Sequence, residues 1–263
     1  MSLTRIDRVF ARAREQSRGV LVTYVMGGDP SVAASLEAVM ACIGGGADIV
    51  ELGFPFSDPI ADGPTIQRAA ERALAAGTTL ATVLELAREI RSKAPEIPLV
   101  LMGYLNPVLA MGVETFFNRA AAVGVDAVIL PDLPPEEAAP LRAQALRGGV
   151  SIVSMLAPTS TPARRAAVLS VASGFTYFVA VTGVTGARTS AHEDISKHLQ
   201  AIRAESKVPV VVGFGIGTAD QARAAVVHAD GVVVGSAIVD RIAKREPLEP
   251  FIVSLRAALS RTR

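Results

Sequence analysis

The chain has 263 residues, of which 50% are hydrophobic and only 5% aromatic, and its formal net charge is +1. That length is enough for one large core, and the composition suits Ala, Val and Leu side chains packed around a parallel sheet. Because the charge is nearly balanced and no basic or acidic block occurs, composition gives no reason to expect nucleic acid or an anionic membrane as partner. A small ligand is expected instead.

The first fifteen residues have the pattern of an amphipathic helix. Leu3, Ile6, Phe10 and Ala13 recur at helical spacing with charged residues between them, which is unlike the apolar centre of a signal peptide. No apolar run approaches the ~20 residues that a membrane span requires. Cys42 is the only cysteine, so disulfides within the chain are excluded and a reducing cytoplasm is the expected location.

Eight short apolar runs follow, and amphipathic or turn-rich segments separate them. The runs predict strands near residues 20–26, 47–53, 98–104, 126–132, 151–158, 175–181, 208–215 and 229–238. Helices are expected from about residues 30 and 65, and over residues 79–93, 113–123 and 134–146. Asp29 or Ser31 can cap the first of these.

This alternation predicts a closed (β/α)₈ barrel with an extra N-terminal helix, formed by residues 1–263 as a single domain. Each run is too apolar for one face to lie in water, which is typical of a parallel sheet covered by helices. The alternative is a doubly wound open sheet. It is disfavoured because eight units of similar length suit closure, and because no G-x-G-x-x-G motif follows the first strand.

Two acids lie where such a barrel performs chemistry, at the carboxyl ends of its strands. Glu51 ends an apolar run, and Asp62 follows in a loop rich in Pro, Gly and Asp. A buried carboxylate needs a partner or has a shifted pKa, and two acids in different surroundings can take different roles in one reaction. The alternative interpretation is structural, because a strand-end Glu is often only hydrogen-bonded and an Asp before Gly-Pro is often a turn residue.

Other catalytic groups are poorly placed in the sequence. The three histidines lie in or beside predicted outer helices, so no metal site is expected. The four lysines all lie away from strand ends, which leaves a Schiff-base mechanism without a nucleophile. Acid and base catalysis by carboxylates remains.

The last third of the chain predicts a phosphate site. Glycine-rich or helix-opening turns occupy residues 183–188, 213–218 and 235–238, after the last three strands. Glycine lets backbone N–H groups approach an anion, and a helix N-terminus adds its dipole. In barrels of this kind the loops after strands seven and eight often hold phosphate, although glycine also serves tight turns.

Several motifs together resemble the tryptophan synthase alpha chain family. They are E-L-G-F-P-F-S-D-P-I-A-D-G-P-T-I-Q, Y-L-N-P-V, P-D-L-P-P-E-E, G-V-T-G-A-R, G-F-G-I and G-S-A-I-V, in this order. The resemblance implies a retro-aldol cleavage of indole-3-glycerol phosphate to indole and glyceraldehyde 3-phosphate. It implies that Glu51 moves protons at indole C3 and the glycerol hydroxyl, that Asp62 binds the indole N–H, and that Tyr177 positions Glu51 or the substrate.

The resemblance also implies binding residues and a partner. Substrate would be held by Tyr24, Met102, Tyr104, Thr185, Gly186, Phe214, Gly215, Gly235 and Ser236. Asp58, Pro59 and Asn106 would face a tryptophan synthase beta chain in an α₂β₂ complex. Pyridoxal phosphate would belong to that partner, and this chain would carry no cofactor. Val181 stands where an Arg is common in the family, and Met26-Gly27 also departs from its pattern.

Rival functions remain open at this point. A sugar-phosphate epimerase would require metal-binding His at strand ends, and a phosphoribosyl-anthranilate isomerase a Cys/Asp pair; neither is visible in the sequence. A third alternative is a barrel that mainly binds or activates a partner. Glu51 and Asp62 argue against that alternative without excluding it.

Overall fold

The computed structural model describes residues 4–180, 188–213 and 215–261. Within that part of the chain all strands form one sheet in which every neighbouring pair is parallel. The strands are β1 (Val20–Met26), β2 (Ile49–Gly53), β3 (Leu99–Met102), β4 (Ala127–Ile129), β5 (Ser151–Ile152), β6 (Ser154–Leu156), β7 (Thr176–Val179), β8 (Val210–Gly213) and β9 (Gly231–Val234). Their order in the sheet is β5-β4-β3-β2-β1-β9-β8-β7-β6.

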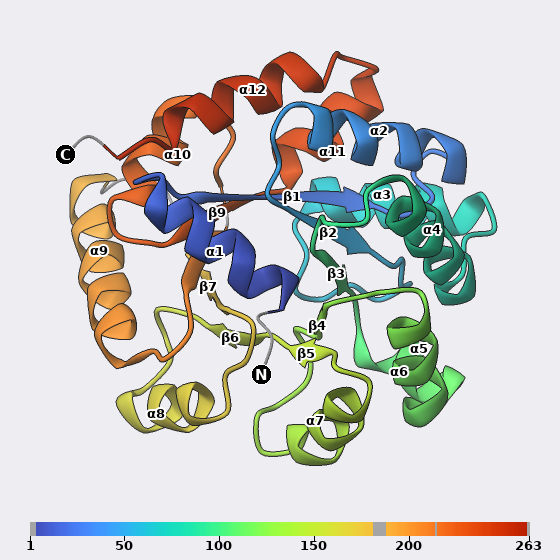
Figure 1. The fold of residues 1–263 in the computed structure, drawn as a ribbon, viewed down its shortest axis with the longest axis horizontal. Coiled ribbons are helices and arrows are strands. Elements are labelled where there is room, and N and C mark those ends of the chain that lie inside the picture. The colour runs from blue at the N-terminus through green and yellow to red at the C-terminus, as the bar shows by residue number, and fades with distance from the viewer. Residues whose placement is uncertain (1–3, 181–187, 214, 262–263) are drawn as a thin grey trace.

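The two ends of that order, β5 and β6, are consecutive in the chain and close the sheet into a barrel (Figure 1). β5 pairs with β4 and β6 pairs with β7, and only Val153 separates them. The predicted fifth strand is therefore divided where it changes partner. The expectation of one continuous strand there was wrong, whereas the closed parallel barrel is confirmed.

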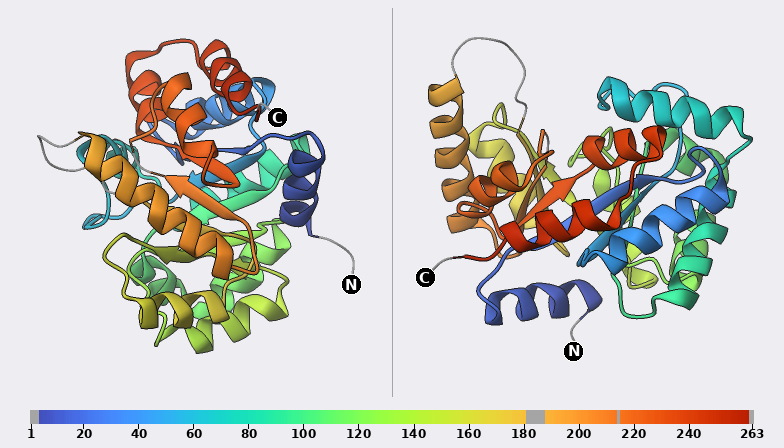
Figure 2. Two further views of the ribbon diagram at one scale, coloured as in Figure 1. Left: turned by 90° about the vertical axis from the view of Figure 1, so that its left-hand side faces the viewer. Right: turned by 90° about the horizontal axis from the view of Figure 1, so that it is seen from above.

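Helices surround the barrel as an outer ring, and α1 lies apart from the ring across one end (Figures 1 and 2). They are α1 (Arg5–Glu15), α2 (Val32–Gly44), α3 (Pro64–Ala75), α4 (Leu80–Lys93), α5 (Leu105–Met111), α6 (Val113–Ala122), α7 (Ala138–Arg147), α8 (Pro162–Ser170), α9 (Arg188–Glu205), α10 (Ala219–Val226), α11 (Ser236–Lys244) and α12 (Glu249–Ala258). The sequence predicted the extra N-terminal helix but not α5.

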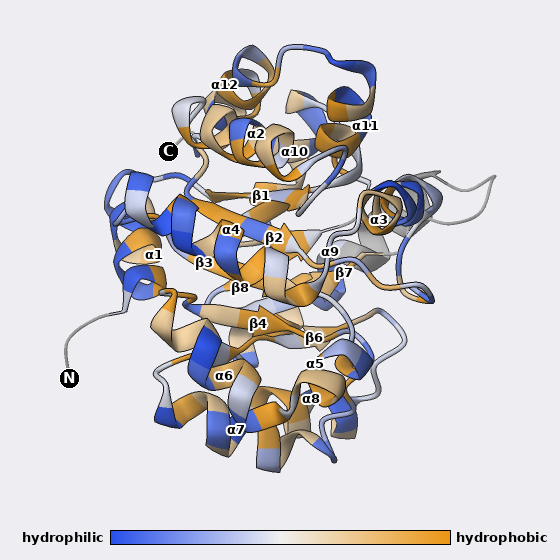
Figure 3. Cartoon of the chain, turned by 90° about the vertical axis from the view of Figure 1, so that its right-hand side faces the viewer, coloured by the Kyte–Doolittle hydropathy of each residue, from blue (hydrophilic) through white to orange (hydrophobic). Residues whose placement is uncertain are grey.

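Local sequence fixes where several helices begin. Thr4 and Asp7 form a capping box at α1, and the Ser31 hydroxyl accepts the Ala34 N–H at α2. Of the two candidate caps of α2, Ser31 is thus the one used, and the Asp29 carboxylate instead accepts two hydrogen bonds from the Arg72 guanidinium, both 2.7 Å long. Apolar positions lie on the strands and on the inward helix faces (Figure 3).

The core has two layers, one between the sheet and the helices and one inside the barrel. The inner layer alternates along the strands, as with Val20 and Val22 of β1. α1 extends it at one end, where the Phe10 and Phe175 ring centroids lie 6.2 Å apart. Because α1 covers the amino-terminal end of the barrel, the free space lies at the opposite end.

Candidate functional site

A cavity of about 550 Å³ occupies the carboxyl-terminal end of the barrel. Its walls come from strand ends, from the loop before α3 and from the turns before α10 and α11. The lining residues are Tyr24, Glu51, Ala61, Asp62, Gly63, Thr65, Ile66, Met102, Pro131, Met155, Tyr177, Val179, Gly215, Ile216, Gly217, Val233, Gly235, Ser236, Ala237 and Asp240. Catalytic groups of (β/α)₈ enzymes lie at this end of the barrel.

Strand register places Glu51 and two tyrosines in this cavity. Tyr24 on β1 is the direct partner of Glu51 on β2, and Tyr177 on β7 is the partner of Met155 on β6. Glycines on the neighbouring strands give the phenols room, because a side chain at Gly53 would clash with the Tyr24 hydroxyl and one at Gly213 with the Tyr177 hydroxyl. These two glycines are therefore required by the shape of the cavity.

Glu51 is a buried acid with an incomplete set of partners. The residue is only 1% exposed, and its Oε2 atom has no hydrogen-bond partner among the described residues. Burial, followed by the negative charge of Asp62, raises the pKa of Glu51 from 4.5 to about 8. At neutral pH Glu51 is mostly protonated and can donate a proton.

Asp62 lies in a more polar setting. Burial raises its pKa from 3.8 to about 6, while a hydrogen bond from the Tyr104 side chain opposes that rise. The Tyr104 hydroxyl also accepts the Ala61 N–H at 3.0 Å, so one phenol links the loop backbone to the carboxylate. At neutral pH Asp62 is mostly ionised. The two acids thus differ in protonation state, which suits them to separate roles.

The other end of the cavity has the backbone geometry of an anion site. Gly215 has a φ of +75°, a left-handed conformation that glycine adopts readily. Gly235 is the N-cap of α11 and Ser236 is its first residue. The first N–H groups of a helix have no partner within the helix and attract anions.

Not every predicted site residue lies in the described part of the chain. Thr185, Gly186 and Phe214, together with Val181, fall outside it. Asp132, a strand-end acid, accepts the Leu105 N–H at 3.0 Å and caps α5, so it does not line the cavity.

The sequence did not single out several apolar lining residues or the acid on α11. These are Ile66, Pro131, Met155, Val179, Ile216, Val233 and Asp240. Alternation along β6, β7 and β9 could have identified the inward residues of those strands. Helical spacing from Ser236 could have identified Asp240, four residues further on.

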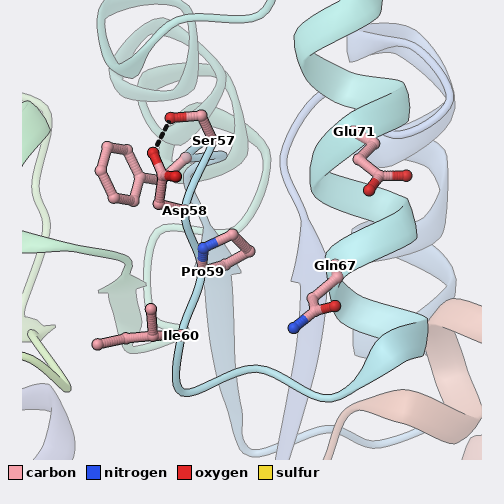
Figure 4. A pocket seen from close by; sticks show the side chains of 7 residues that line it. Ser57, Asp58, Pro59, Ile60, Gln67 and Glu71 are labelled. Atoms are coloured by element: carbon pink, nitrogen blue, oxygen red, sulfur yellow. Dashed lines mark hydrogen bonds between the residues drawn. The ribbon is translucent and has the colours of Figure 1, made fainter.

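A second pocket, of about 270 Å³, lies between the loop after β2 and α3 (Figure 4). Asp58 and Pro59 line it together with Gln67 and Glu71. Ile60, which also lines this pocket, is 83% exposed.

An aromatic contact leads from this loop toward Asp62 in the cavity wall. The Phe56 ring stacks at 5.5 Å on Tyr104, the residue that contacts Asp62. Asn106 is exposed on α5, the helix that directly follows Tyr104.

Three further sequence interpretations concern the cysteine, metal binding and membrane spans. Cys42 is fully buried, and burial raises its pKa to about 12, so it is an inert core residue. No cluster of three or more metal-ligating His, Cys, Asp or Glu side chains occurs among the residues that the structure describes. In the same part of the chain, no helix combines the length and hydropathy of a membrane span.

Comparison with known proteins assigns the family. The model of the family described as "Tryptophan synthase alpha chain" matches residues 10–258. The tryptophan synthase alpha chain of Geobacter sulfurreducens is 50% identical over 263 residues, covering 98% of this chain and 99% of its own length. That of Caulobacter vibrioides is 48% identical over 242 residues, covering 92% and 88%.

Solved structures agree with the sequence comparison. A Mycobacterium tuberculosis tryptophan synthase structure aligns with a TM-score of 0.91 at 37% identity, covering 99% of this chain and 100% of the other. An Aquifex aeolicus structure aligns with a TM-score of 0.92 at 41% identity, covering 98% and 100%. Sequence, fold and the cavity with its two acids agree, and the chain belongs to the tryptophan synthase alpha chain family.

Proposed function

We propose that Glu51 and Asp62 carry out the reaction of this family, the cleavage of indole-3-glycerol phosphate to indole and glyceraldehyde 3-phosphate. One observation carries the proposal. Both acids line a single cavity at the carboxyl-terminal end of the barrel, and their pKa values, about 8 and about 6, lie on opposite sides of neutrality.

Each acid then has a distinct part in bond cleavage. Protonated Glu51 donates its proton to indole C3, and ionised Asp62 accepts the ring N–H and stabilises the positive charge that spreads to that nitrogen. The bond between C3 and the side-chain carbon breaks, and its electrons return to the indole ring. The adjacent hydroxyl gives its proton to the Glu51 carboxylate and becomes the aldehyde, which restores protonated Glu51.

The other predicted site residues hold the substrate. Tyr24, Met102 and Tyr104, with Phe214, form the indole pocket, and Tyr177 positions Glu51 or the substrate. The phosphate is bound by backbone at Gly186, Gly215 and Gly235 with the Ser236 hydroxyl, and Thr185 hydrogen-bonds Asp62. The position of Gly235 and Ser236 at the start of α11, in the wall of the same cavity, supports this arrangement.

The family implies a beta-chain partner. We place its contact on the loop carrying Asp58 and Pro59, with Asn106, in an α₂β₂ complex whose pyridoxal phosphate lies in the partner. Exposed Ile60 beside these residues, and the Phe56–Tyr104 contact that leads from the loop to Asp62, support that location.

Indole release from indole-3-glycerol phosphate, measured with and without a beta chain, tests the proposal. We expect slow release by the purified chain and a strong increase when the partner is added, because ordering of loops around an active site commonly depends on a partner. Asp62→Asn should reduce release by at least about 100-fold in both conditions. No release by folded wild-type protein with a competent beta chain would instead indicate a binding subunit.

A further inference from the structure

Asp240 is an acid in the wall of the catalytic cavity for which the proposed chemistry has no use. It lies on α11 four residues after Ser236, and both residues line the cavity, as does Ala237. Residues four apart on a helix are neighbours on one face, with about 5–6 Å between their Cβ atoms. Asp240 therefore lies on the same face of α11 as Ser236, about one helical turn from the start of the helix.

The charge balance of the cavity makes this placement unfavourable for an anion. The described lining residues include three acids and no Lys, Arg or His; of the acids, Glu51 is mostly protonated at neutral pH, which leaves Asp62 and Asp240 as the negative charges. A phosphate dianion at the start of α11 therefore meets backbone N–H groups on one side and a carboxylate about one helical turn away. An Asn at that position would have the same shape without the repulsion.

Lys244 moderates this repulsion from the next turn of the same helix. Its Nζ atom lies 2.6 Å from Asp240 Oδ2, and the two side chains are 58% and 47% exposed. Lys244 follows Asp240 by four residues, as Asp240 follows Ser236. Ser236, Asp240 and Lys244 thus form a row that begins at the cavity and ends in solvent.

We propose that Asp240 lowers the affinity of the cavity for phosphate dianions and so promotes release of the phosphate-bearing product. Lys244 sets the strength of that effect by partly neutralising the carboxylate. The inference rests on the proposed function, since it needs the phosphate to lie at Gly235 and Ser236. Asp240 thus adds electrostatic repulsion to a phosphate site that otherwise consists of backbone and hydroxyl groups.

Two substitutions separate this role from simple helix stabilisation. Asp240→Asn and Lys244→Met both remove the ion pair, so a purely structural pair predicts weaker ligand binding in both variants. The proposal predicts opposite signs. Asp240→Asn should lower the inhibition constant of glycerol 3-phosphate and the KM for indole-3-glycerol phosphate about two- to fivefold, whereas Lys244→Met should raise both by a similar factor.

The measurement is inhibition of indole release by glycerol 3-phosphate in the purified full chain, at pH 8 and low ionic strength, where screening is weak. Glu85→Gln is the matched control, because it removes the same charge from an exposed ion pair on α4, outside the cavity lining. The shifts at position 240 should shrink when salt is added, and the control should show none.

Ser236→Ala separates failure of this inference from failure of the phosphate site itself. Weaker inhibition in Ser236→Ala, with no change or a loss of affinity in Asp240→Asn, would overturn the role of Asp240 and leave the phosphate site intact. No effect in Ser236→Ala, Asp240→Asn or Lys244→Met would place the phosphate elsewhere and overturn both.

Discussion

Two buried acids, one just before β2 and one in its middle, lie in opposite environments. Asp48, just before the strand, is 4% exposed and accepts hydrogen bonds from two nitrogens of the Arg18 guanidinium, at 2.8 and 2.9 Å, and from the Leu21 N–H at 3.0 Å. Glu51, three residues later, is 1% exposed and forms no ion pair with any described residue. The same short segment therefore holds one satisfied carboxylate and one unsatisfied carboxylate.

The presence or absence of a counterion distinguishes the structural acid from the proposed catalytic acid in this barrel. Desolvation of Asp48 is offset by a paired guanidinium, so its charge contributes to the folded state. Desolvation of Glu51 is not offset, and its pKa rises to about 8. An acid that donates a proton at neutral pH, as proposed for Glu51, needs a raised pKa and therefore an environment without a counterion. Burial of Glu51 without a counterion lowers the stability of the folded state, and this cost arises at the end of the barrel that holds the cavity.

The largest effect is expected from Glu51→Gln, which removes the proposed proton donor at nearly constant size. Indole release should fall by roughly 10³-fold or more, because positioned acid–base groups contribute about 10²–10⁴-fold and Glu51 acts on two protons. Indole release should be measured with the beta chain present, and circular dichroism should confirm the fold. Turnover within tenfold of the wild type would remove Glu51 from the mechanism.

The same variant should change how stability depends on pH. Because the folded-state pKa of Glu51 lies above its value of 4.5 in the unfolded chain, the wild type loses stability as pH rises from about 4.5 to 8. Relative to the wild type, Glu51→Gln should therefore gain a few kcal/mol in free energy of unfolding between pH 5 and pH 9, since a tenfold change in a proton-binding constant corresponds to about 1.4 kcal/mol. Urea denaturation at the two pH values measures this difference.

Asp48→Asn should give the opposite result. It leaves the Arg18 guanidinium, 7% exposed, without its buried counterion, so the free energy of unfolding should fall by about 3–5 kcal/mol. Activity per folded molecule should stay within about twofold, because Asp48 does not line the cavity.

Glu85→Gln is again the control for this loss of stability. It breaks exposed ion pairs with Arg88 and Arg119 and should cost less than about 1 kcal/mol. A stability loss in Asp48→Asn no larger than that of the control would show that the buried pair contributes little.

Features that depend on local pattern could be predicted from the sequence. Apolar runs of seven to ten residues marked the strands, and the rule that barrel chemistry lies at strand ends singled out Glu51 and Asp62, both of which line the cavity. The change of partner at Val153 could not be predicted, because it depends on how the whole sheet closes. α5 was missed because it is short, contains Pro107 and is capped by Asp132, which lies 27 residues away.

Electrostatic details depend on similarly distant residues. The partner of Asp48 is Arg18, and the group that opposes the pKa rise of Asp62 is Tyr104, neither of which is near its acid in the chain. A sequence pattern shows which acids stand at strand ends. It does not show which of them has a counterion, and that distinction decides between a structural and a catalytic acid.

The smallest effect is expected from Tyr104→Phe. The Tyr104 hydroxyl donates one neutral hydrogen bond to the Asp62 carboxylate, whereas Arg18 donates two charged hydrogen bonds to Asp48. Removing that hydroxyl removes a hydrogen bond that lowers the pKa of Asp62, so this pKa should rise above about 6. The acidic limb of the pH profile of kcat/KM should move to higher pH by about 0.5–1 unit. The variant should therefore be less active than the wild type at low pH, and this difference in kcat/KM should be small near pH 9.

Tyr177→Phe is the matched control for this shift. It removes a phenol hydroxyl from the cavity wall, and Tyr177 is not among the groups that set the pKa of Asp62. Its acidic limb should therefore stay in place, even if kcat falls. If the limb moves equally in both variants, the general polarity of the cavity sets the ionisation of Asp62. If the limb moves only in Tyr104→Phe, the Tyr104 hydroxyl is what keeps Asp62 mostly ionised at a pH where Glu51 is mostly protonated.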